Sequence, residues 1–511
     1  MRTIWSLVLG ATVTFVAVPA FAQKSQDTLR IAINNPFSVL SSYDLPLDEA
    51  GIFSHDVYDY LLKYDEHNQK FVPSLAKSWK RIDNQTVEME LRDDIKFHNG
   101  DPFEANDVKS TVEYIIDPKS KITYQSRYNW IDRIEVLDKH KLRVHAKKPT
   151  ATDLMLLAYR IPIYDSKLMD KMTEKQDYGR LNPIGTGIYK VVSMDTNKGI
   201  LVEVNDAFNT IQGGKKPGVK RVAGIPMPDK QTQTAQIMVG GVDLLRAVPP
   251  DTAKALTEQS KDVKATYVAA PNLIYLALDS VGNGPNKALK DQRVRKAIFM
   301  GIDRESIIKH IVPGGHVAEH VQNDCFKATV ACSYTVFPPK YDPEGAKKLL
   351  AEAGYPNGLD VNYVVFAPYK AIGEAIAGDL RRINVRMSIQ AVDISLYRRL
   401  QGDNKLEAWS SLFPTGSYPD AGNIFSVLFT GPAMEYYNDD VIADAMAKGE
   451  AEFDPEKRKQ IYQRAFNRIN EMNYHLAISS VPTVYVHSKD VKIKTNAFSA
   501  GENYIVDYVW N

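Results

Sequence analysis

The sequence predicts an α/β protein, in which strands and helices alternate along much of the chain. Two observations carry this prediction. From about residue 271 onward, short apolar runs typical of buried strands alternate with segments whose apolar residues recur at helical spacing. Several helical segments also begin with an aspartate that can cap a helix. No internal repeat or low-complexity linker interrupts the 511 residues, a length that suits two or three domains.

The N-terminal stretch 1–22 is typical of a signal peptide. Arg2 is followed by an apolar run from Ile4 to Val18, which ends at the small-x-small sequence Ala20-Phe21-Ala22. The run is too short to span a membrane, and it has no polar face, as an amphipathic helix of the folded domain would need. No cysteine at the cleavage point offers a lipid anchor. We expect a mature chain that begins at or near Gln23 and functions outside the cytoplasm.

The first half of the mature chain is predicted to contain mainly strands. Asn106-Asp107 offers caps for an amphipathic helix that ends near Ile115-Ile116. Pro183, Gly185 and Gly187 then break the chain before a strand hairpin. The predicted strands are Thr28–Ile33, Val87–Leu91, Leu142–Ala146, Ile188–Val192 and its hairpin partner Leu201–Val204.

The second half alternates more regularly. A compact apolar strand is predicted at Leu273–Leu278, and a β-α-β unit follows later in the chain. That unit comprises strand Val361–Phe366, helix Ile372–Ile383 and strand Val385–Val392. The other predicted helices are Arg293–Met300, one capped by Asp303, one from Asp342-Pro343 to Gly354, and one from Asp454-Pro455 to about Ile469.

Composition excludes some classes of protein. The 63 basic and 62 acidic side chains give a net charge of +1, which is unlike the concentrated basic surface of a nucleic-acid-binding protein. No second apolar run reaches about 18 residues, so no membrane span is expected in the mature chain. The 27 tyrosines suit either a polar ligand site or a large protein with many half-buried rings.

The two cysteines, Cys325 and Cys332, are expected to form one disulfide, which is the default in an exported protein. The bond would close a loop of about eight residues and contribute roughly 2–3 kcal/mol, so it would hold one loop and not the whole fold. Two isolated cysteines favour neither a metal site nor a catalytic role.

One motif with catalytic potential occurs, His316-Val317-Ala318-Glu319-His320, which matches the zinc-protease pattern H-x-x-E-H. On a helix, His316 and His320 would share a face and could bind Zn²⁺, while Glu319 activated water. The motif follows Pro313-Gly314-Gly315, which leaves room for at most two helical turns, and no third zinc ligand is evident. An incidental pair of surface histidines is the favoured interpretation, and no enzyme activity, cofactor or metal is predicted.

A series of ordered motifs gives a stronger indication. They are Val72–Trp79, Glu90–Gly100, Phe103–Val108, Pro183–Tyr189, Gly240–Asp243, Asp291–Ala297 with Ile302–Arg304, and Ala346–Gly358. In this order they resemble the signature of the family 5 extracellular solute-binding proteins, the large peptide-binding type that serves ATP-binding-cassette (ABC) importers. The resemblance covers nearly the whole mature chain.

The resemblance implies a periplasmic-binding-protein-like fold of two lobes that close on a ligand, as a Venus flytrap does. Lobe I would comprise residues 23–270, with an extra domain Ib inserted at about 55–180, and lobe II residues 271–480. Residues 481–511 would return to lobe I. The lobes would be connected near Ala269–Asn272 and Ser479–Pro482, and the signature around Trp79–Val108 would have a structural role.

The resemblance also implies where a ligand would bind. Relatives that bind dipeptides hold the peptide ammonium with a tryptophan and an aspartate three residues later, and pair the carboxylate with an arginine. Here Leu412 and Thr415 occupy the first two positions, and Lys370 is the only cation in the segment that matches the third. A plain dipeptide is therefore not expected, since a buried ammonium without a carboxylate partner is costly.

Several residues remain as predicted ligand contacts, with ordinary packing as an equally weighted alternative for each. Asp420 and Tyr418 are expected to face the cleft between the lobes, on the loop after a strand around Trp409–Leu412. The full predicted set is Asp420, Tyr418, Thr415, Trp409, Tyr369 and Lys370.

The predicted function is that of a periplasmic binding protein without enzyme activity. It would capture a peptide, an opine or another polar solute and deliver it to the permease subunits and ATPases of an inner-membrane ABC transporter. The protein is expected to be a monomer and to bind no nucleic acid. The alternatives are an exported zinc hydrolase that uses the histidine motif and a solute receptor for signalling.

Overall fold

The structure is a computed structural model that describes residues 27–34, 37, 39–41, 43, 48–66, 68–120, 122, 125–181, 183–208, 217–312, 325, 329–413, 418–494 and 503–511. The predicted signal peptide and the motif with His316, Glu319 and His320 lie outside these residues.

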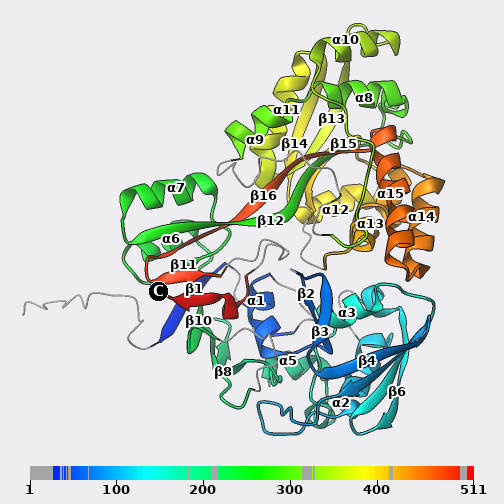
Figure 1. Ribbon diagram of the computed structural model, residues 1–511. Helices are drawn as coiled ribbons and strands as arrows, with labels where there is room; N and C mark the ends of the chain where they lie inside the picture. The colour runs from blue at the N-terminus through cyan, green and yellow to red at the C-terminus, as the bar shows by residue number, and fades with distance from the viewer. Residues whose placement is uncertain are drawn as a thin grey trace, which may run out of the picture.

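The largest sheet of the described structure is mixed and has ten strands (Figure 1). Its two longest strands, β12 and β16, pair antiparallel and extend from one body of the protein into the other. Across the sheet the order is β14 (Val385–Val392), β13 (Leu359–Phe366), β15 (Ala408–Phe413), β12 (Val263–Leu278), β16 (His475–Ser488), β11 (Leu244–Leu245), β1 (Thr28–Ile33), β10 (Arg221–Pro226), β9 (Gly199–Val204) and β8 (Tyr189–Asp195).

The pairing of β12 with β16 is interrupted where the strands pass between the two bodies. Val268 pairs with Thr483, and the next paired residues are Asn272 and Val481, so the register shifts at this point. A bulge of this kind breaks the ladder locally and bends the strand. The irregularity falls within the two segments that the resemblance predicts as connections between lobes.

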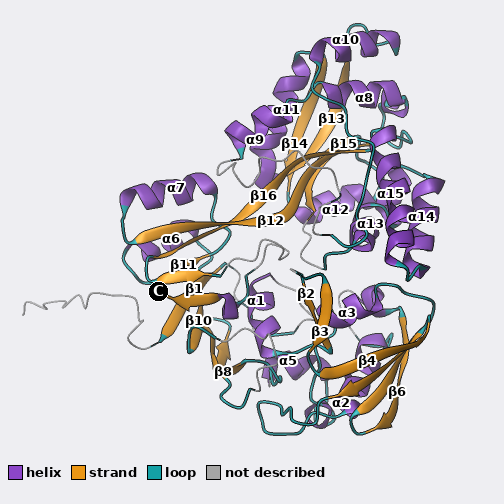
Figure 2. Ribbon diagram, in the orientation of Figure 1, coloured by secondary structure: helices purple, strands orange, loops and turns teal. Residues whose placement is uncertain are grey.

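Lobe II is built around the parallel strands β13, β14 and β15, with helices on both faces (Figure 2). Leu273, Tyr275 and Ala277 of β12 face one core, whereas Ile274, Leu276 and Leu278 face the other, which explains the uninterrupted apolar run. The helices are α8 (Gln292–Met300), α9 (Arg304–Ile311), α10 (Pro343–Glu352), α11 (Lys370–Arg381), α12 (Ile394–Gly402), α13 (Ala421–Leu428), α14 (Asp440–Ala451) and α15 (Pro455–Met472).

Lobe I contains the other end of the large sheet and a separate four-stranded sheet (Figures 1 and 2). The small sheet has the order β4 (Ala76–Asp83), β5 (Thr86–Leu91), β7 (Lys141–Ala146) and β6 (Ile131–Asp138). The further elements of lobe I are α1 (Asp48–Val57), the hairpin β2 (Leu62–Asp65) and β3 (Lys70–Pro73), α2 (Ala105–Ile116), α3 (Asp153–Tyr159), α4 (Ser166–Met169), α5 (Tyr178–Leu181), α6 (Lys230–Met238), α7 (Pro250–Gln259), and the strands β17 (Val491–Ile493) and β18 (Tyr508–Trp510).

The predicted α/β fold class is confirmed, and most predicted elements occur within a few residues of their expected bounds. The prediction of the cap of α2 was wrong. Glu104 is its N-cap, and Asp107 is the third helical residue, whose carboxylate accepts a hydrogen bond from the Glu104 backbone N–H. A reciprocal capping box thus starts the helix two residues earlier than expected.

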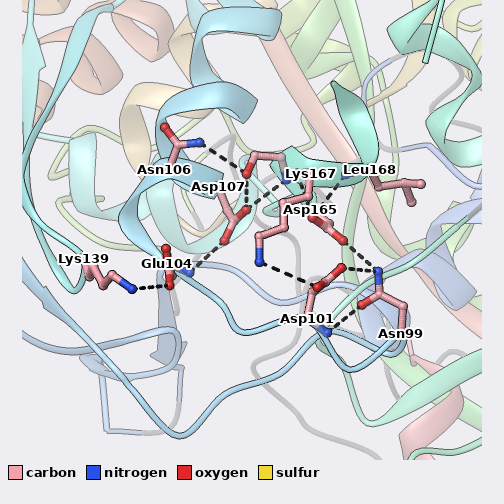
Figure 3. Close-up of polar contacts among 10 residues, drawn as sticks. Asn99, Asp101, Glu104, Asn106, Asp107, Lys139, Asp165, Lys167 and Leu168 are labelled. Atoms are coloured by element: carbon pink, nitrogen blue, oxygen red, sulfur yellow. Dashed lines mark hydrogen bonds and ion pairs between the residues drawn. The ribbon is translucent and has the colours of Figure 1, made fainter. Parts of the chain in front are cut away.

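Asp107 also joins α2 to α4 in a buried polar network (Figure 3). Its Oδ1 accepts hydrogen bonds from the backbone N–H of Ser166 (2.9 Å) and from the Ser166 hydroxyl (2.6 Å). Next to it, Asp165 caps α4 and accepts a hydrogen bond from the Asn99 amide (2.8 Å). The polar residues of this sequence signature therefore hold elements of lobe I together.

His98, from the same signature, connects to the glycine motif at residues 185–187. Its Nε2 lies 3.0 Å from the Gly187 carbonyl oxygen, and the Gly185 backbone N–H donates to its Nδ1 over 3.2 Å. This pairing requires a neutral ring, with the proton on Nε2. Burial accordingly lowers the pKa of His98 from 6.5 to about 4.

We expect the free energy of unfolding to fall by about 2–3 kcal/mol as the pH decreases from 6.5 to 4, through His98 alone. Between pH 6.5 and 4 the unfolded chain binds a proton on His98 and the folded chain does not, so a falling pH favours unfolding. Above pH 6.5 His98 is neutral in both states, and its effect on stability no longer changes with pH. Urea unfolding at several pH values measures the slope. His98→Gln, which keeps a donor and an acceptor, should remove this part of it, whereas His310→Gln on the exposed face of α9 should not. An unchanged slope in His98→Gln would contradict the assignment.

Candidate functional site

The carboxyl ends of β13 and β15 lie at the same edge of the sheet in lobe II. The strands are parallel neighbours, with Tyr363 opposite Ala408 and Val365 opposite Ser410. The segments that follow them carry Tyr369 and Lys370 after one strand and Tyr418 and Asp420 after the other. This is the edge at which open α/β sheets usually bind ligands. Thr415 lies outside the described residues.

Asp420 is placed in the interior of lobe II. Only 3% of it is exposed, and both carboxylate oxygens lie 2.6 Å from guanidinium nitrogens of Arg458 in α15. The carboxylate also accepts a hydrogen bond from the Gly422 backbone N–H and so caps α13. The carboxylate that the sequence predicts as a ligand contact is thus already paired with a buried arginine far along the chain.

Trp409 is likewise part of the core. It is 1% exposed, and its ring centre lies 4.7 Å from that of Tyr436 and 6.4 Å from that of Tyr437, all within lobe II. These ring contacts are of the kind expected from core packing, which is the alternative to ligand contact for Trp409.

Tyr369 and Lys370 lie where β13 gives way to α11. The Tyr369 ring centre is 5.8 Å from that of Phe366, and burial raises the pKa of Tyr369 to about 12. Lys370 is exposed, and its ammonium lies 3.3 Å from the Glu374 carboxylate one helical turn on. Neither residue contacts Tyr418 or Asp420 through an interaction found in the described part of the chain.

Tyr418 is the predicted site residue that meets the other lobe. The guanidinium carbon of Arg160 lies 5.5 Å from the centre of the Tyr418 ring, within cation–π distance. Arg160 is the C-cap residue of α3 in lobe I. Burial raises the pKa of Tyr418, and nearby Asp420 raises it further. Figure 1 shows α3 and the β2–β3 hairpin facing α13 across the boundary between the lobes.

Three further tyrosines of lobe I lie on the same side of the boundary, and together with Arg160 and Tyr418 we name them the interlobe cluster. Its other members are Tyr60, Tyr64 and Tyr159. Burial and the charge of Asp420 in the opposite lobe raise the pKa of Tyr64 to about 12. The Tyr159 hydroxyl donates to the Glu66 carboxylate (2.7 Å). Sequence reasoning missed these lobe I residues, because the high tyrosine content was the only signal and no motif marks them.

A second contact between the lobes lies at the end of α14. The backbone N–H of Ala151 donates to the Glu450 carbonyl oxygen (2.7 Å), and the Lys148 ammonium lies 2.9 Å from the Glu450 carboxylate. Beside them, the Arg81 guanidinium carbon lies 4.2 Å from the centre of the Phe453 ring. The described residues thus join the lobes at this edge as well as at the interlobe cluster.

The structure pairs Cys325 with Cys332 in a disulfide, and the loop between them supports the segment with Tyr418. Within this loop, Val330 donates its backbone N–H to the Pro419 carbonyl oxygen and accepts from the Ala421 N–H, each over 2.9 Å. The disulfide loop therefore holds the start of α13 in place.

Replacing both cysteines with serine should lower the free energy of unfolding by about 2–3 kcal/mol, because the unfolded chain regains the freedom of a short closed loop. Urea unfolding of the wild type and the double variant measures the difference. A reductant should destabilise the wild type by a similar amount and leave the double variant unchanged. Equal stability of the wild type and the double variant in the absence of reductant would contradict the prediction.

The described residues include no group of three or more histidine, cysteine, aspartate or glutamate side chains that could hold a metal ion. Within the same residues, no helix has the length and apolar character needed to cross a membrane.

Comparisons with known proteins place the chain in a family. Residues 70–436 match the family described as bacterial extracellular solute-binding proteins, family 5. The glutathione-binding protein GsiB of Pectobacterium atrosepticum is 24% identical over 483 residues, which are 91% of this chain and 90% of that protein.

Two solved structures share the fold. One is the periplasmic binding protein DppA of Helicobacter pylori in complex with the peptide STSA, with a TM-score of 0.75, 21% identity and coverage of 96% of this chain and 100% of that one. The other is NikA of Brucella suis in complex with Fe(III)-EDTA, with a TM-score of 0.80, 21% identity and coverage of 95% and 100%.

The family match spans both lobes and includes the segments that position Arg160 and Tyr418. Proteins of this family bind solutes for ABC importers and do not catalyse reactions, which excludes the zinc-hydrolase alternative. The chain therefore belongs to the family 5 bacterial extracellular solute-binding proteins, the substrate-binding components of ABC importers.

Proposed function

We propose that this protein captures a peptide-like or other small polar solute between lobe I and lobe II and delivers it to an ABC permease in the inner membrane. The observation that carries the proposal is the contact of Tyr418 with Arg160, which brings the predicted binding edge of lobe II against lobe I. A solute bound at this position would touch both lobes and favour their closed arrangement.

The connection between the lobes supports this mode of binding. Two strands, β12 and β16, cross together, and their ladder is interrupted between Val268 and Asn272. A few residues at such an irregularity are sufficient to absorb the rotation of two rigid bodies. We propose the lobe boundaries on the same basis, with lobe I at 23–270, domain Ib at about 55–180, lobe II at 271–480 and a return to lobe I at 481–511.

The class of solute follows from two considerations. One related protein is named glutathione-binding, and two related structures are complexes with a peptide and with Fe(III)-EDTA, so the shared fold accommodates compact polar ligands of different kinds. In this chain Leu412 and Thr415 replace the residues expected to hold a dipeptide ammonium, and Asp420 pairs with Arg458. A simple dipeptide such as Ala-Ala is accordingly expected to bind weakly.

Export to the periplasm, with cleavage near Ala22 and Gln23, completes the proposal. The permease and its ATPases reside at the inner membrane, and a carrier that loads them must meet its solute outside the cytoplasm. N-terminal sequencing of the protein from a periplasmic fraction should start at Gln23 or within two residues of it.

The function is tested by mass spectrometry of the compound that co-purifies with the protein. The protein is isolated without denaturation, unfolded in guanidinium chloride, and the released small molecules are compared with those from a Tyr418→Ala variant. A single polar compound in near-equal amount to the wild-type protein, much reduced in the variant, would support the proposal. A refolded wild-type protein that binds no component of a peptide and metabolite mixture would contradict it.

A further inference from the structure

We propose that Arg160 binds a carboxylate group of the captured solute, so that the ligand of this protein is an anionic compound held from lobe I. The inference rests on the proposed function and specifies the class of ligand. It depends on the position of Arg160, on its lack of an acidic partner, and on the engagement of the neighbouring carboxylates elsewhere.

Arg160 projects from the end of α3 toward lobe II. Its backbone N–H closes the helix on the Leu156 carbonyl oxygen, and an antiparallel bridge between Tyr60 and Pro162 fixes the chain just beyond it. The side chain reaches the Tyr418 ring of the opposite lobe. Backbone interactions thus place the guanidinium at the boundary where closure of the lobes would enclose a solute.

The guanidinium has no acidic partner in the described part of the chain. No described carboxylate lies within ion-pair distance of it, and its Nε is buried without a hydrogen-bond acceptor among the same residues. Its described neighbours, Tyr60 and Tyr418, are neutral phenols, since burial raises the pKa of each. A buried guanidinium N–H without an acceptor is costly, and an acceptor supplied by a ligand would remove that cost.

Carboxylates on the elements that carry or face Arg160 have other partners. Asp420 pairs with Arg458, Asp153 with Arg81 (2.7 Å), and Glu66 accepts a hydrogen bond from the Tyr159 hydroxyl. On lobe I, Asp59 accepts a hydrogen bond from Thr186 and lies 3.2 Å from the Lys63 ammonium. None of these carboxylates pairs with Arg160, so its guanidinium is left without a counter-charge among the described residues, and an acidic group of a ligand could supply one.

A carboxylate fits this arrangement better than a spherical anion. The planar guanidinium can present two parallel N–H groups to two carboxylate oxygens, and such charge-assisted pairs are stronger than neutral hydrogen bonds. The surrounding tyrosine rings exclude water and offer flat surfaces to the rest of the solute. Because the lobes exclude solvent when they close, the pair would be screened less than one on the surface.

The test uses two forms of one probe. Refolded protein is mixed with a casein peptide digest plus glutathione, or with the same mixture after methyl esterification, which neutralises carboxylates and leaves amines and phosphates unchanged. Protein is separated by rapid gel filtration, and the bound compounds are quantified by mass spectrometry. We expect capture from the untreated mixture only. Arg160→Ala should weaken binding of the captured compound about ten- to hundredfold, as for the loss of a hydrogen bond to a charged group.

Two further variants separate charge from fold. Arg160→Lys keeps the positive charge and should retain part of the binding, whereas Arg133→Ala removes an exposed arginine of β6 and should bind as the wild type does. Melting temperatures of all variants should remain close to that of the wild type. Equal capture from both mixtures, or full binding by Arg160→Ala, would overturn the carboxylate proposal and leave the proposed function intact. Capture from neither mixture would overturn both.

Discussion

Replacing Arg458 with alanine is expected to lower the free energy of unfolding by about 3–5 kcal/mol, the usual cost of removing one partner from a buried ion pair. Arg458 is 5% exposed and Asp420 is 3% exposed, so the variant would leave a carboxylate in the interior without its counter-charge. Arg458 also donates a hydrogen bond from its Nε to the Gly449 carbonyl oxygen (2.9 Å), which would lose its donor. The pair connects α13, α14 and α15, and its loss should loosen all three helices.

Urea unfolding of Arg458→Ala measures this effect. Arg464→Ala, which removes an exposed arginine from the same helix, serves as the matched control and should change stability by less than about 0.5 kcal/mol. The double variant Asp420→Ala with Arg458→Ala should be more stable than the sum of the single effects implies, because neither charge is left alone. If the free energy of unfolding of Arg458→Ala lay within about 1 kcal/mol of the wild-type value, the ion pair would not stabilise the fold as predicted.

The second large effect is expected at Gly185, in the glycine motif that follows Pro183. A Cβ atom at this position would lie 1.9 Å from the carbonyl oxygen of Val57 and 2.8 Å from the Tyr58 ring. The obstacle is backbone at the end of α1, which cannot turn aside as a flexible side chain can. Gly185→Ala should therefore lower the free energy of unfolding by about 3 kcal/mol, at the upper end of the range for overpacked sites.

Gly378 provides the matched control for this substitution. It lies on the exposed face of α11, and a Cβ atom there would meet nothing within 4 Å. Gly378→Ala should raise stability by about 0.5–1 kcal/mol, since alanine is the better helix former. Differential scanning calorimetry of both variants gives the comparison. A Gly185→Ala protein as stable as the wild type would mean that α1 is not packed against this motif as described.

Local features of the fold could be predicted from the sequence because their causes are local. Asp303, Asp342 and Asp454 cap α9, α10 and α15 as expected, since a cap depends on a few adjacent residues. The full extent of β12 was not predicted. Its first half, which starts at Val263, mixes polar and apolar residues and becomes a strand through its pairing with β16.

Less of the candidate site could be predicted from the sequence, because its contacts join distant parts of the chain. The resemblance indicated the segment with Asp420, yet the role of this carboxylate is set by Arg458, 38 residues away. Trp409 lies on a strand buried on both faces, which a pattern read from one segment does not reveal. Arg160 carries no motif at all, and its importance emerges only when α3 of lobe I meets Tyr418 of lobe II.

The central claim, that a solute draws the two lobes together, is tested most directly by pulsed electron paramagnetic resonance. Spin labels would be attached to cysteines introduced at Lys139 in lobe I and Lys296 in lobe II, both exposed, while the native cysteines remain paired in their disulfide. On addition of the compound that co-purifies with the protein, the distance distribution should become narrower and shift to shorter values. The same distribution with and without a saturating amount of that compound would contradict the claim.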